Sequence, residues 1–146
     1  MAINQVHAAT DKTALVEAEV YRWYNLFFPW SRGMSSRSEG AIKPLYDALA
    51  NDFRVVLTDG EIMCRADYWE RLWGLYGKRA GSPESHITNL SITALPGDCF
   101  LAVFDLVKDG ITKKKVDSAL MRVDQASPSG ISWVYVHESE HERSFA

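Results

Sequence analysis

The sequence contains few of the residues that mark cofactor and metal sites. It has two cysteines, Cys64 and Cys99, and they stand far apart with no CxxC spacing, which argues against a zinc ribbon or a redox motif and favours two free thiols. Its 9 glycines occur singly at turns, so the phosphate-binding loops of nucleotide enzymes are absent. The four histidines have neither HxH nor HExxH spacing. We therefore expect no metal and no cofactor.

Positive charge and long apolar runs are also scarce. With 16 basic and 19 acidic residues the net charge is −3, which disfavours nucleic acid as a partner. The one basic run, residues 113–115, follows Asp109-Gly110 and is typical of a solvated hairpin edge. No apolar segment approaches the roughly 20 residues that span a bilayer, and residues 1–12 lack the pattern of a signal peptide. We expect a cytoplasmic protein with no membrane contact.

The apolar content is sufficient for one domain over residues 1–146, because 47% of the chain is hydrophobic. Apolar residues recur at helical spacing over residues 13–30, with Asp11 as the expected N-cap, and again over residues 41–50 and 65–79. Residues 30–40 are rich in Ser, Gly and Arg and indicate a mobile loop that lies over a pocket mouth. Residues 1–11 and 139–146 are expected to be flexible tails.

Six strands are expected after the second helix. Residues 53–58 and 61–64 are joined at Asp59-Gly60 and predict a hairpin. Four further strands are predicted at residues 86–95, 99–107, 115–124 and 131–138, separated by Pro-, Gly- and Asp-containing turns. This order predicts an α+β fold in which three helices pack on a mostly antiparallel six-stranded sheet. A sheet that curls around helices leaves a cavity wherever side chains do not fill it.

Two segments carry a resemblance to a known family. The stretch LANDFRVVLTDGEIMCRADYWERL (49–72) and the closing GISWVYVHES (130–139) resemble the nuclear transport factor 2-like superfamily, especially its SnoaL-like and ketosteroid-isomerase-like small bacterial domains. The closing segment is also similar to the last strand of the association domain of calcium/calmodulin-dependent kinase II. The resemblance covers nearly the whole chain and implies a cone-like fold. It does not select a function, since the superfamily includes isomerases, dehydratases, epoxide hydrolases, oligomerisation modules and transport adaptors.

The resemblance to ketosteroid isomerases can be compared residue by residue. Their chemistry uses a carboxylate base on the first strand together with a tyrosine and a neutral acid that stabilise the enolate. The alignment places Leu57 at the base position and Ala119 at the acid position, while Tyr24 or Trp23 occupies the tyrosine position. A slip of one or two residues brings Asp59 nearer to the base position. Because two of the three positions are apolar, this comparison argues against proton abstraction by that set.

Strand alternation gives the expected pocket wall. On the last strand it places Trp133, Tyr135 and His137 on one face and Val134, Val136 and Glu138 on the other, and the resemblance implies that the first set faces the cavity. On the preceding strand the inward set is Ala119, Met121 and Val123, with Leu120 and Arg122 outward. The residues expected to contact a ligand are Trp69, Met121, Trp133 and Tyr135.

Three residues are candidates for chemistry. Asp105 interrupts the apolar strand CFLAVFDLV, and a buried carboxylate there needs a partner, for which His137 is the candidate. Such a pair would orient the imidazole as a general base, and the Tyr24 hydroxyl would act as a donor in the cavity. The alternative is structural: Asp105 faces solvent or a subunit, His137 bonds backbone or ligand, and Tyr24 belongs to the core.

Two functions remain open. One is a small-molecule-binding protein or cofactor-free isomerase, hydratase or lyase that acts on a hydrophobic or aromatic compound, with His137, Asp105 and Tyr24 as its catalytic residues. The other is a non-catalytic homodimeric interaction or ligand-sensing module, in which Leu120, Val134 and Val136 on the outer sheet face meet a second copy. Whether the protein is an enzyme is left open by the sequence.

Overall fold

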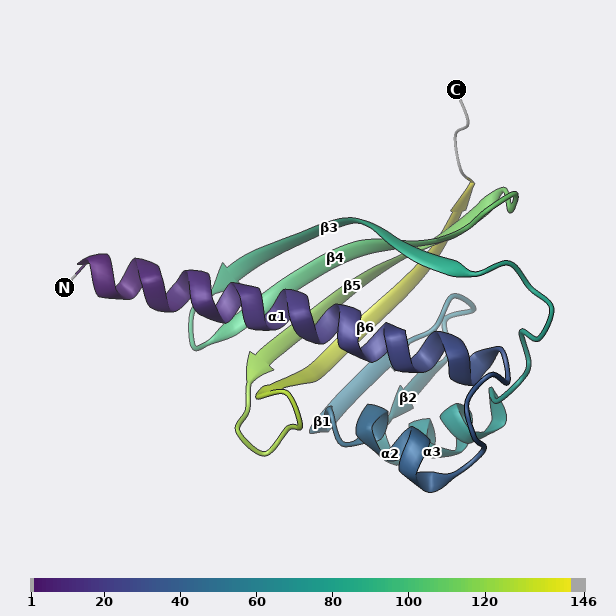
Figure 1. The fold of residues 1–146 in the computed structure, drawn as a ribbon. Helices are drawn as coiled ribbons and strands as arrows, with labels where there is room; N and C mark the ends of the chain where they lie inside the picture. Colours follow the sequence, from purple (N-terminus) through teal and green to yellow (C-terminus); the bar gives the residue numbers. More distant parts are fainter. Residues whose placement is uncertain (1, 143–146) are drawn as a thin grey trace.

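The computed structural model describes the backbone of residues 2–142 and the side chains of residues 12–142. Three helices pack on a six-stranded sheet that is antiparallel except between β1 and β6, which confirms the expected α+β fold (Figure 1). The elements are α1 (Ala2–Ser31), α2 (Glu39–Tyr46), β1 (Leu49–Val56), β2 (Ile62–Cys64), α3 (Arg65–Gly74), β3 (Ser85–Leu95), β4 (Cys99–Lys108), β5 (Lys113–Val123) and β6 (Ile131–Glu142).

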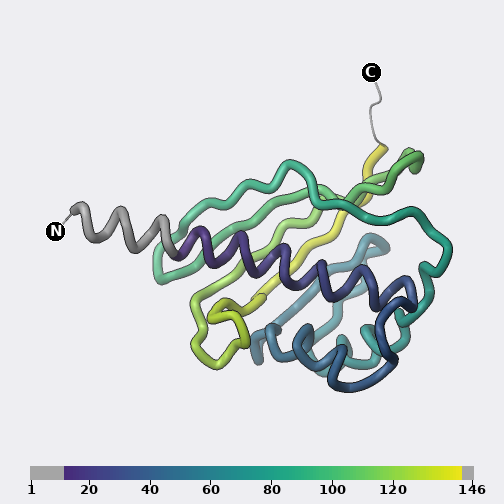
Figure 2. Tube along the Cα trace, viewed as in Figure 1, coloured from purple at the N-terminus to yellow at the C-terminus, as the bar shows by residue number. Residues whose placement is uncertain are grey.

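The sheet has the strand order β2-β1-β6-β5-β4-β3. The long α1 lies across one face of this curved sheet, and α2 and α3 lie together near the end of the sheet formed by β1 and β2 (Figures 1 and 2). One face of the sheet is therefore covered by helices, whereas its other face is covered by no element of the described chain. We call these the inner and the outer face.

Helix α1 is longer than its sequence pattern predicts. The expected helix begins after Asp11, yet the backbone is helical from Ala2. The segment that was expected to be a tail is thus part of α1 from Ala2 onward. Residues 2–11 contain no glycine or proline, so nothing in this segment interrupts the hydrogen bonds of a helix that packing stabilises further along.

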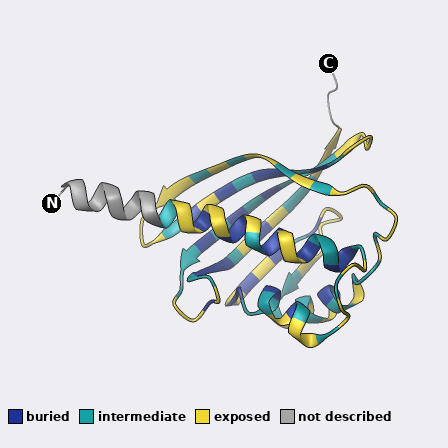
Figure 3. Cartoon of the chain, viewed as in Figure 1, coloured by how far each residue is buried: buried dark blue, intermediate teal, exposed yellow. Residues whose placement is uncertain are grey.

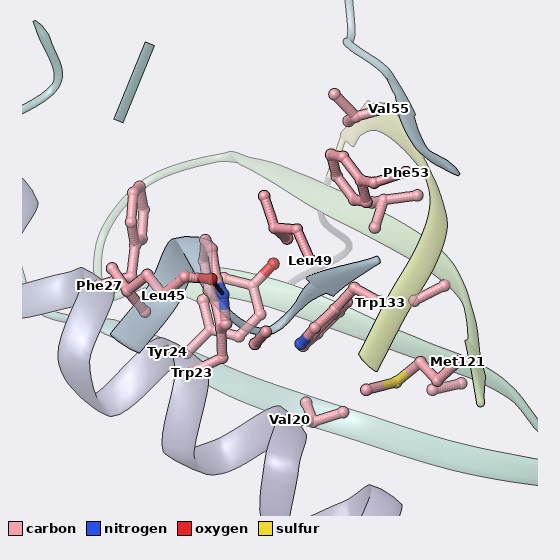
Figure 4. Packing of buried hydrophobic residues seen from close by; sticks show 14 of the residues in the cluster. Val20, Trp23, Tyr24, Phe27, Leu45, Leu49, Phe53, Val55, Met121 and Trp133 are labelled. Carbon is pink, nitrogen blue, oxygen red and sulfur yellow. Dashed lines mark hydrogen bonds between the residues drawn. The ribbon is translucent and has the colours of Figure 1, made fainter. Parts of the chain in front are cut away.

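The core lies between α1 and the inner face (Figure 3). Buried side chains of α1 recur every three or four residues and meet large apolar side chains from β4, β5 and β6. Figure 4 shows Trp23 and Tyr24 on the helix facing Trp133 of β6, and the rings of Trp23 and Trp133 have centroids 5.8 Å apart. The buried apolar and aromatic residues in the described part of α1 are Val16, Val20, Trp23, Tyr24, Phe27 and Trp30.

The last turn of α1 is held by the segment that follows α3. The amide of Gly77 donates to the carbonyl of Trp30 at 3.1 Å, and the amide of Arg79 donates to Ser31 at 2.8 Å. These bonds satisfy carbonyls that a helix end leaves without partners. The approach requires glycine, because a Cβ on Gly33 would lie 3.3 Å from the Cα of Gly77. Both glycines also have positive φ, a conformation that glycine adopts at little cost.

The segment between α1 and α2 does not cover a pocket mouth. The Tyr76 hydroxyl donates to the carbonyl of Ser35 at 2.6 Å, and the Arg37 guanidinium lies 5.3 Å from the ring centroid of Trp73. Residues 32–38 therefore pack on the end of α3, and none of them lines either of the cavities described below. The expectation that this loop lies over the pocket is wrong.

Several element ends differ from the sequence prediction. Helix α2 ends at Tyr46, and the buried Leu49 and Ala50 begin β1 instead of closing the helix. Helix α3 ends at Gly74, and turns occupy residues 75–82. Strand β6 continues to Glu142, so the expected flexible tail at 139–146 is wrong for residues 139–142, and residues 143–146 lie outside the described part. Apolar periodicity locates the element centres, while pairing partners decide the ends.

A buried carboxylate attaches α1 to the sheet. Glu19 is fully buried, and its Oε2 accepts a hydrogen bond of 2.8 Å from the indole nitrogen of Trp133. The Arg22 guanidinium binds both oxygens of the same carboxylate, at 2.6 and 2.9 Å. Charged and polar groups can be buried at acceptable cost when each has partners, as here.

We expect Glu19→Ala to lower the free energy of unfolding by about 3–5 kcal/mol, because it leaves a buried indole N–H and a partly buried guanidinium without their acceptor. Glu17→Ala is the matched control, since Glu17 is exposed on the same helix and should change stability by less than about 0.5 kcal/mol. Urea unfolding followed by tryptophan fluorescence measures both. Equal effects of the two substitutions would contradict the anchoring role of Glu19.

Candidate functional site

A bulge in β6 decides which of its side chains face the helices. Leu120 of β5 pairs with Tyr135, whereas the next residue, Met121, pairs with Trp133, so Val134 is an extra residue in β6. An extra residue reverses the alternation of inward and outward side chains beyond it. Trp133 faces inward as expected, but beyond the bulge Val136 and Glu138 face inward and Tyr135 and His137 face outward.

The expectation that Tyr135 and His137 face the cavity is therefore wrong. Tyr135 is 38% exposed, His137 is also exposed, and neither lines a cavity. Val136 is likewise buried in the core instead of lying on the outer face. The simple period of two fails at this point because it assumes an unbroken ladder.

Asp105 is not the partner of His137. It lies on the outer face, where its carboxylate accepts from the Asn89 amide at 2.9 Å and from the Lys114 ammonium at 3.0 Å. Asp105 is opposite Val116 of β5, whereas His137 is opposite Ser118, so the two side chains belong to different rows of the sheet. The proposed Asp–His pair is wrong, and Asp105 has the structural role of holding Asn89 and Lys114.

Two adjoining cavities lie between the helices and the inner face. The larger one, which we call the outer cavity although it lies on the inner face of the sheet, has a volume of about 190 Å³ and extends from α1 to the turn that joins β4 and β5. The inner cavity has about 30 Å³, a volume that admits one water molecule. Trp23, Tyr24, Tyr68 and Glu138 line both cavities and separate them, and Asp117 lines the inner one.

The polar centre of the site is a hydrogen bond between α1 and β5. The Tyr24 hydroxyl donates to Oδ2 of Asp117 at 2.9 Å, and both residues are buried. The other carboxylate oxygen, Oδ1, is buried without a hydrogen-bond partner among the described residues. Asp117 lines the inner cavity, so a carboxylate with unused hydrogen-bonding capacity is next to this cavity.

Burial gives Asp117 an unusual proton affinity. Desolvation, followed by repulsion from Glu138, raises the pKa of Asp117 to about 7, although the hydrogen bond from Tyr24 and the charge of Lys115 oppose the rise. Burial and the neighbouring Asp117 raise the pKa of Tyr24 well above its ordinary value. Tyr24 is therefore a constant donor, and Asp117 is the group that gains and loses a proton near neutral pH.

A second carboxylate lies beside the first. Glu138 of β6 is directly opposite Asp117 of β5, and its carboxylate lies 3.5 Å from the Lys115 ammonium. Tyr68 of α3 lines both cavities from the helix side, and burial raises its pKa, so its hydroxyl also keeps its proton. The site thus contains one acid that titrates near neutrality and one carboxylate held by a cation, an arrangement in which the two groups can take different roles.

The structure brings only some of the expected residues to the site. Tyr24 lines both cavities, and Trp133 lines the inner one. Met121 faces inward as expected but is packed in the core, and Trp69 lies against Tyr46, so neither lines a cavity. Cys64 and Cys99 are free thiols, as the sequence predicts.

Asp117 was not among the expected site residues, although a signal for it exists. It precedes the inward-facing Ala119 and Met121 by two and four residues, so alternation on β5 alone places this carboxylate inward. The ketosteroid-isomerase comparison placed the acid at Ala119, and the structure has an acid two residues earlier on the same face. The position expected for the base is occupied by Leu57, which is apolar and is buried in the structure. Glu138 had no such signal, since its orientation depends on the bulge.

The described residues do not contain other types of site. No three His, Cys, Asp or Glu side chains among residues 12–142 are grouped in a way that would hold a metal ion. No helix in the described part of the chain is long and apolar enough to cross a membrane.

Comparison with solved structures identifies the fold. The chain superposes on an NTF2-like protein of unknown function from Pseudomonas aeruginosa with a TM-score of 0.71 and 17% identity, over 87% of this chain and 98% of that one. A cystatin-like fold protein from Burkholderia xenovorans matches with a TM-score of 0.61 and 11% identity, over 92% and 95% of the two chains. This chain has the NTF2-like fold that the sequence resemblance predicts.

A third similar structure is a putative calcium/calmodulin-dependent kinase II association domain from Exiguobacterium sibiricum, with a TM-score of 0.59 and 7% identity over 90% of this chain and 94% of that one. No protein-family model matches the sequence. No curated protein matches it either. At these identities the likeness concerns the fold, and function has to be argued from the side chains.

The raised pKa of Asp117 predicts how stability depends on pH. The folded state binds the Asp117 proton more tightly than the unfolded chain does, so stability falls as pH rises from about 4 to about 7. Asp117→Asn keeps an acceptor for Tyr24 and carries no charge. We expect this variant to be more stable than the wild type at pH 8 by roughly 2–4 kcal/mol, with the difference vanishing near pH 4.

Urea unfolding at pH 4, 6 and 8 measures this difference. Asp109→Asn is the control, because Asp109 lies in an exposed turn, and it should show no gain that depends on pH. An Asp117→Asn variant that is destabilised equally at every pH would mean that Asp117 is charged throughout this range.

Proposed function

We propose that this protein binds a small hydrophobic or aromatic molecule in the outer cavity and transfers a proton to or from it without a cofactor, as an isomerase, hydratase or lyase does. The observation that supports the proposal most strongly is the buried Asp117, which titrates near neutral pH beside a ligand-sized cavity. A general acid or base is most effective when its pKa is close to the working pH.

The residues around Asp117 have distinct roles in this proposal. Tyr24 donates to Oδ2 and orients the carboxyl group, which leaves Oδ1 without a hydrogen-bond partner among the described residues in a side chain that lines the inner cavity. A water molecule in the inner cavity would relay the proton between Oδ1 and a ligand in the outer one. Glu138, whose carboxylate lies 3.5 Å from the Lys115 ammonium, favours the neutral form of Asp117 by charge repulsion. Tyr24 and Glu138 are positioning residues, and Asp117 is the proposed acid and base.

The apolar walls support a ligand of low polarity. Trp23, Phe27 and Phe28 of α1 and Leu106 of β4 line the outer cavity, and aromatic walls of this kind bind apolar rings. The walls also reduce the access of water, which strengthens the electrostatic interactions of the groups inside.

Exchange of carbon-bound hydrogen tests this proposal without knowledge of the natural substrate. A panel of aryl ketones and aromatic 2-oxo acids is incubated in D2O near neutral pH, and proton NMR follows deuterium incorporation next to the carbonyl. We expect the protein to accelerate incorporation for at least one compound. Asp117→Asn should reduce the accelerated rate by about 10²-fold or more, the usual contribution of a general base, and Tyr24→Phe should change its pH profile.

Asp109→Asn serves as the control for this experiment, because its carboxylate is outside both cavities. Exchange that persists at the wild-type rate in Asp117→Asn would refute the role of Asp117. The absence of protein-dependent exchange for the whole panel would refute the proposed acid–base function.

A second candidate function is a homodimeric interaction module. The outer sheet face carries a row of apolar side chains on adjacent strands, Leu101, Leu120 and Tyr135, of which Leu101 and Tyr135 are more than a third exposed. Ile62 on β2 is 66% exposed at the same face's edge. Apolar rows of this kind favour a partner surface. The similarity to a putative association domain adds support for a second copy as that partner.

Light scattering coupled to size exclusion tests this candidate. We expect a dimer that Leu101→Glu converts to a monomer, because the charge would be buried in the interface. Leu15→Glu is the matched control, since Leu15 is also an exposed leucine but lies on α1. A wild-type monomer at about 100 μM, a concentration at which specific dimers are formed, would refute the candidate.

A further inference from the structure

The outer cavity has two chemically different ends. Aromatic side chains of α1 and Tyr68 form one end, next to Asp117. The other end lies where β4 finishes and β5 begins, and its lining is strongly basic. The cations at this end are Lys108 on β4 and Lys113 and Lys115 on β5, with Arg79 near Lys108, and Arg71 on α3 also lines the cavity.

The carboxylates of the cavity do not balance this charge. Glu138 lies 3.5 Å from Lys115, and Glu140 lies 3.3 Å from Lys113, so each carboxylate is matched by one lysine. Two further cations, Arg71 and Arg79, line the same cavity. Lys114 also touches the lining, but its ammonium pairs with Asp105 on the outer face. The lining therefore has an excess of positive charge.

Arg79 and Lys115 lie close enough to Lys108 to repel it. Partial burial, followed by the charges of Arg79, Lys115 and Arg32, lowers the pKa of Lys108. A group of like charges in a partly enclosed cavity attracts an anion, because the low-dielectric walls focus the field. Arginine is suited to this role, since its planar guanidinium binds a carboxylate through two parallel hydrogen bonds.

Arg79 joins the two ends of the cavity. Its guanidinium lies 5.9 Å from the ring centroid of Phe27, so the charged group is adjacent to the aromatic wall. A ligand with an anionic group at Arg79 would thus place its body along α1. The cavity volume of about 190 Å³ is below the roughly 300–1,000 Å³ of pockets for drug-sized ligands, which limits the ligand to about one or two rings.

We propose that the ligand is a small aromatic carboxylate whose acid group is bound by Arg71 and Arg79, while its ring contacts the aromatic side chains of α1. This inference rests on the proposed function and assigns the chemical class of its ligand. It also gives the ligand one orientation, in which the end remote from the carboxylate points to Tyr24 and Asp117. Cations that bind the acid group would offset its repulsion from Glu138 and Glu140.

The test compares acids with neutral ligands of the same shape. The probes are benzoate, trans-cinnamate and 2-naphthoate, each paired with its primary amide, and inorganic phosphate serves as an anion without an apolar body. Isothermal titration calorimetry of the full chain at pH 7.5 and 0.15 M NaCl measures each affinity. We expect at least one acid to bind about tenfold or more tightly than its amide and than phosphate, the usual advantage of a charge-assisted contact.

Arginine variants then locate the acid group. Arg71→Gln and Arg79→Gln should each weaken binding of that acid by about three- to tenfold and leave the amide unchanged. Arg122→Gln is the matched control, because Arg122 pairs with Asp52 outside both cavities, and it should bind the acid as the wild type does. Circular dichroism of each variant confirms that it is folded before binding is measured.

The outcomes separate this inference from the proposed function. Equal affinity for acid and amide, phosphate binding as tight as that of the acid, or no effect of either arginine variant would overturn the carboxylate assignment and leave the proton-transfer proposal standing. A preference for the acid together with no Asp117-dependent deuterium exchange would uphold the ligand class and refute the catalysis. No binding by any acid or amide would overturn both.

Discussion

The composition of the cavity depends on one extra residue in β6. The bulge at Val134 allows Trp133 and Glu138, five positions apart, to face the same side of the sheet. In an unbroken strand two residues an odd number apart face opposite sides. Without the bulge, either Trp133 would leave Glu19 without its indole donor or Glu138 would leave Asp117 without its charged neighbour. The anchoring of α1 and the chemistry of the cavity are thus consequences of the same irregularity.

The buried polar groups divide into two kinds. Glu19 accepts three hydrogen bonds, two from Arg22 and one from Trp133, so both of its oxygens have partners. Its burial contributes to the attachment of α1 to the sheet. Asp117 has one hydrogen bond and a second oxygen without a partner, although it is as deeply buried. Buried polar groups with a purely structural role usually have all their hydrogen-bond partners. A buried carboxylate that lacks a partner and has a shifted pKa is therefore more typical of a functional site.

The two faces of the sheet support different functions that do not compete. The inner face carries the acid, the cavity and its cationic end, whereas the outer face carries the apolar row Leu101, Leu120 and Tyr135. His137 and Asp105 belong to the outer face instead of the cavity: His137 lies in the row next to these apolar residues, and Asp105 lies one row further on. A dimer formed through the outer face would leave the inner cavity open to a ligand. The two candidate functions therefore rest on different faces of the sheet and can be tested separately.

The sequence by itself determined the α+β order, the hairpin at Asp59-Gly60, the four long strands and the aromatic face of α1. These features depend on local spacing and turn chemistry, which a single sequence displays. The tertiary structure alone decided that His137 faces outward, that Glu138 faces inward and that Asp105 pairs with Lys114. The reason is that each depends on the register between strands, and one bulge reverses every side chain beyond it. Asp117 lies between these cases: alternation predicts its direction, but only packing shows that it is buried against Tyr24 and holds its proton near neutral pH.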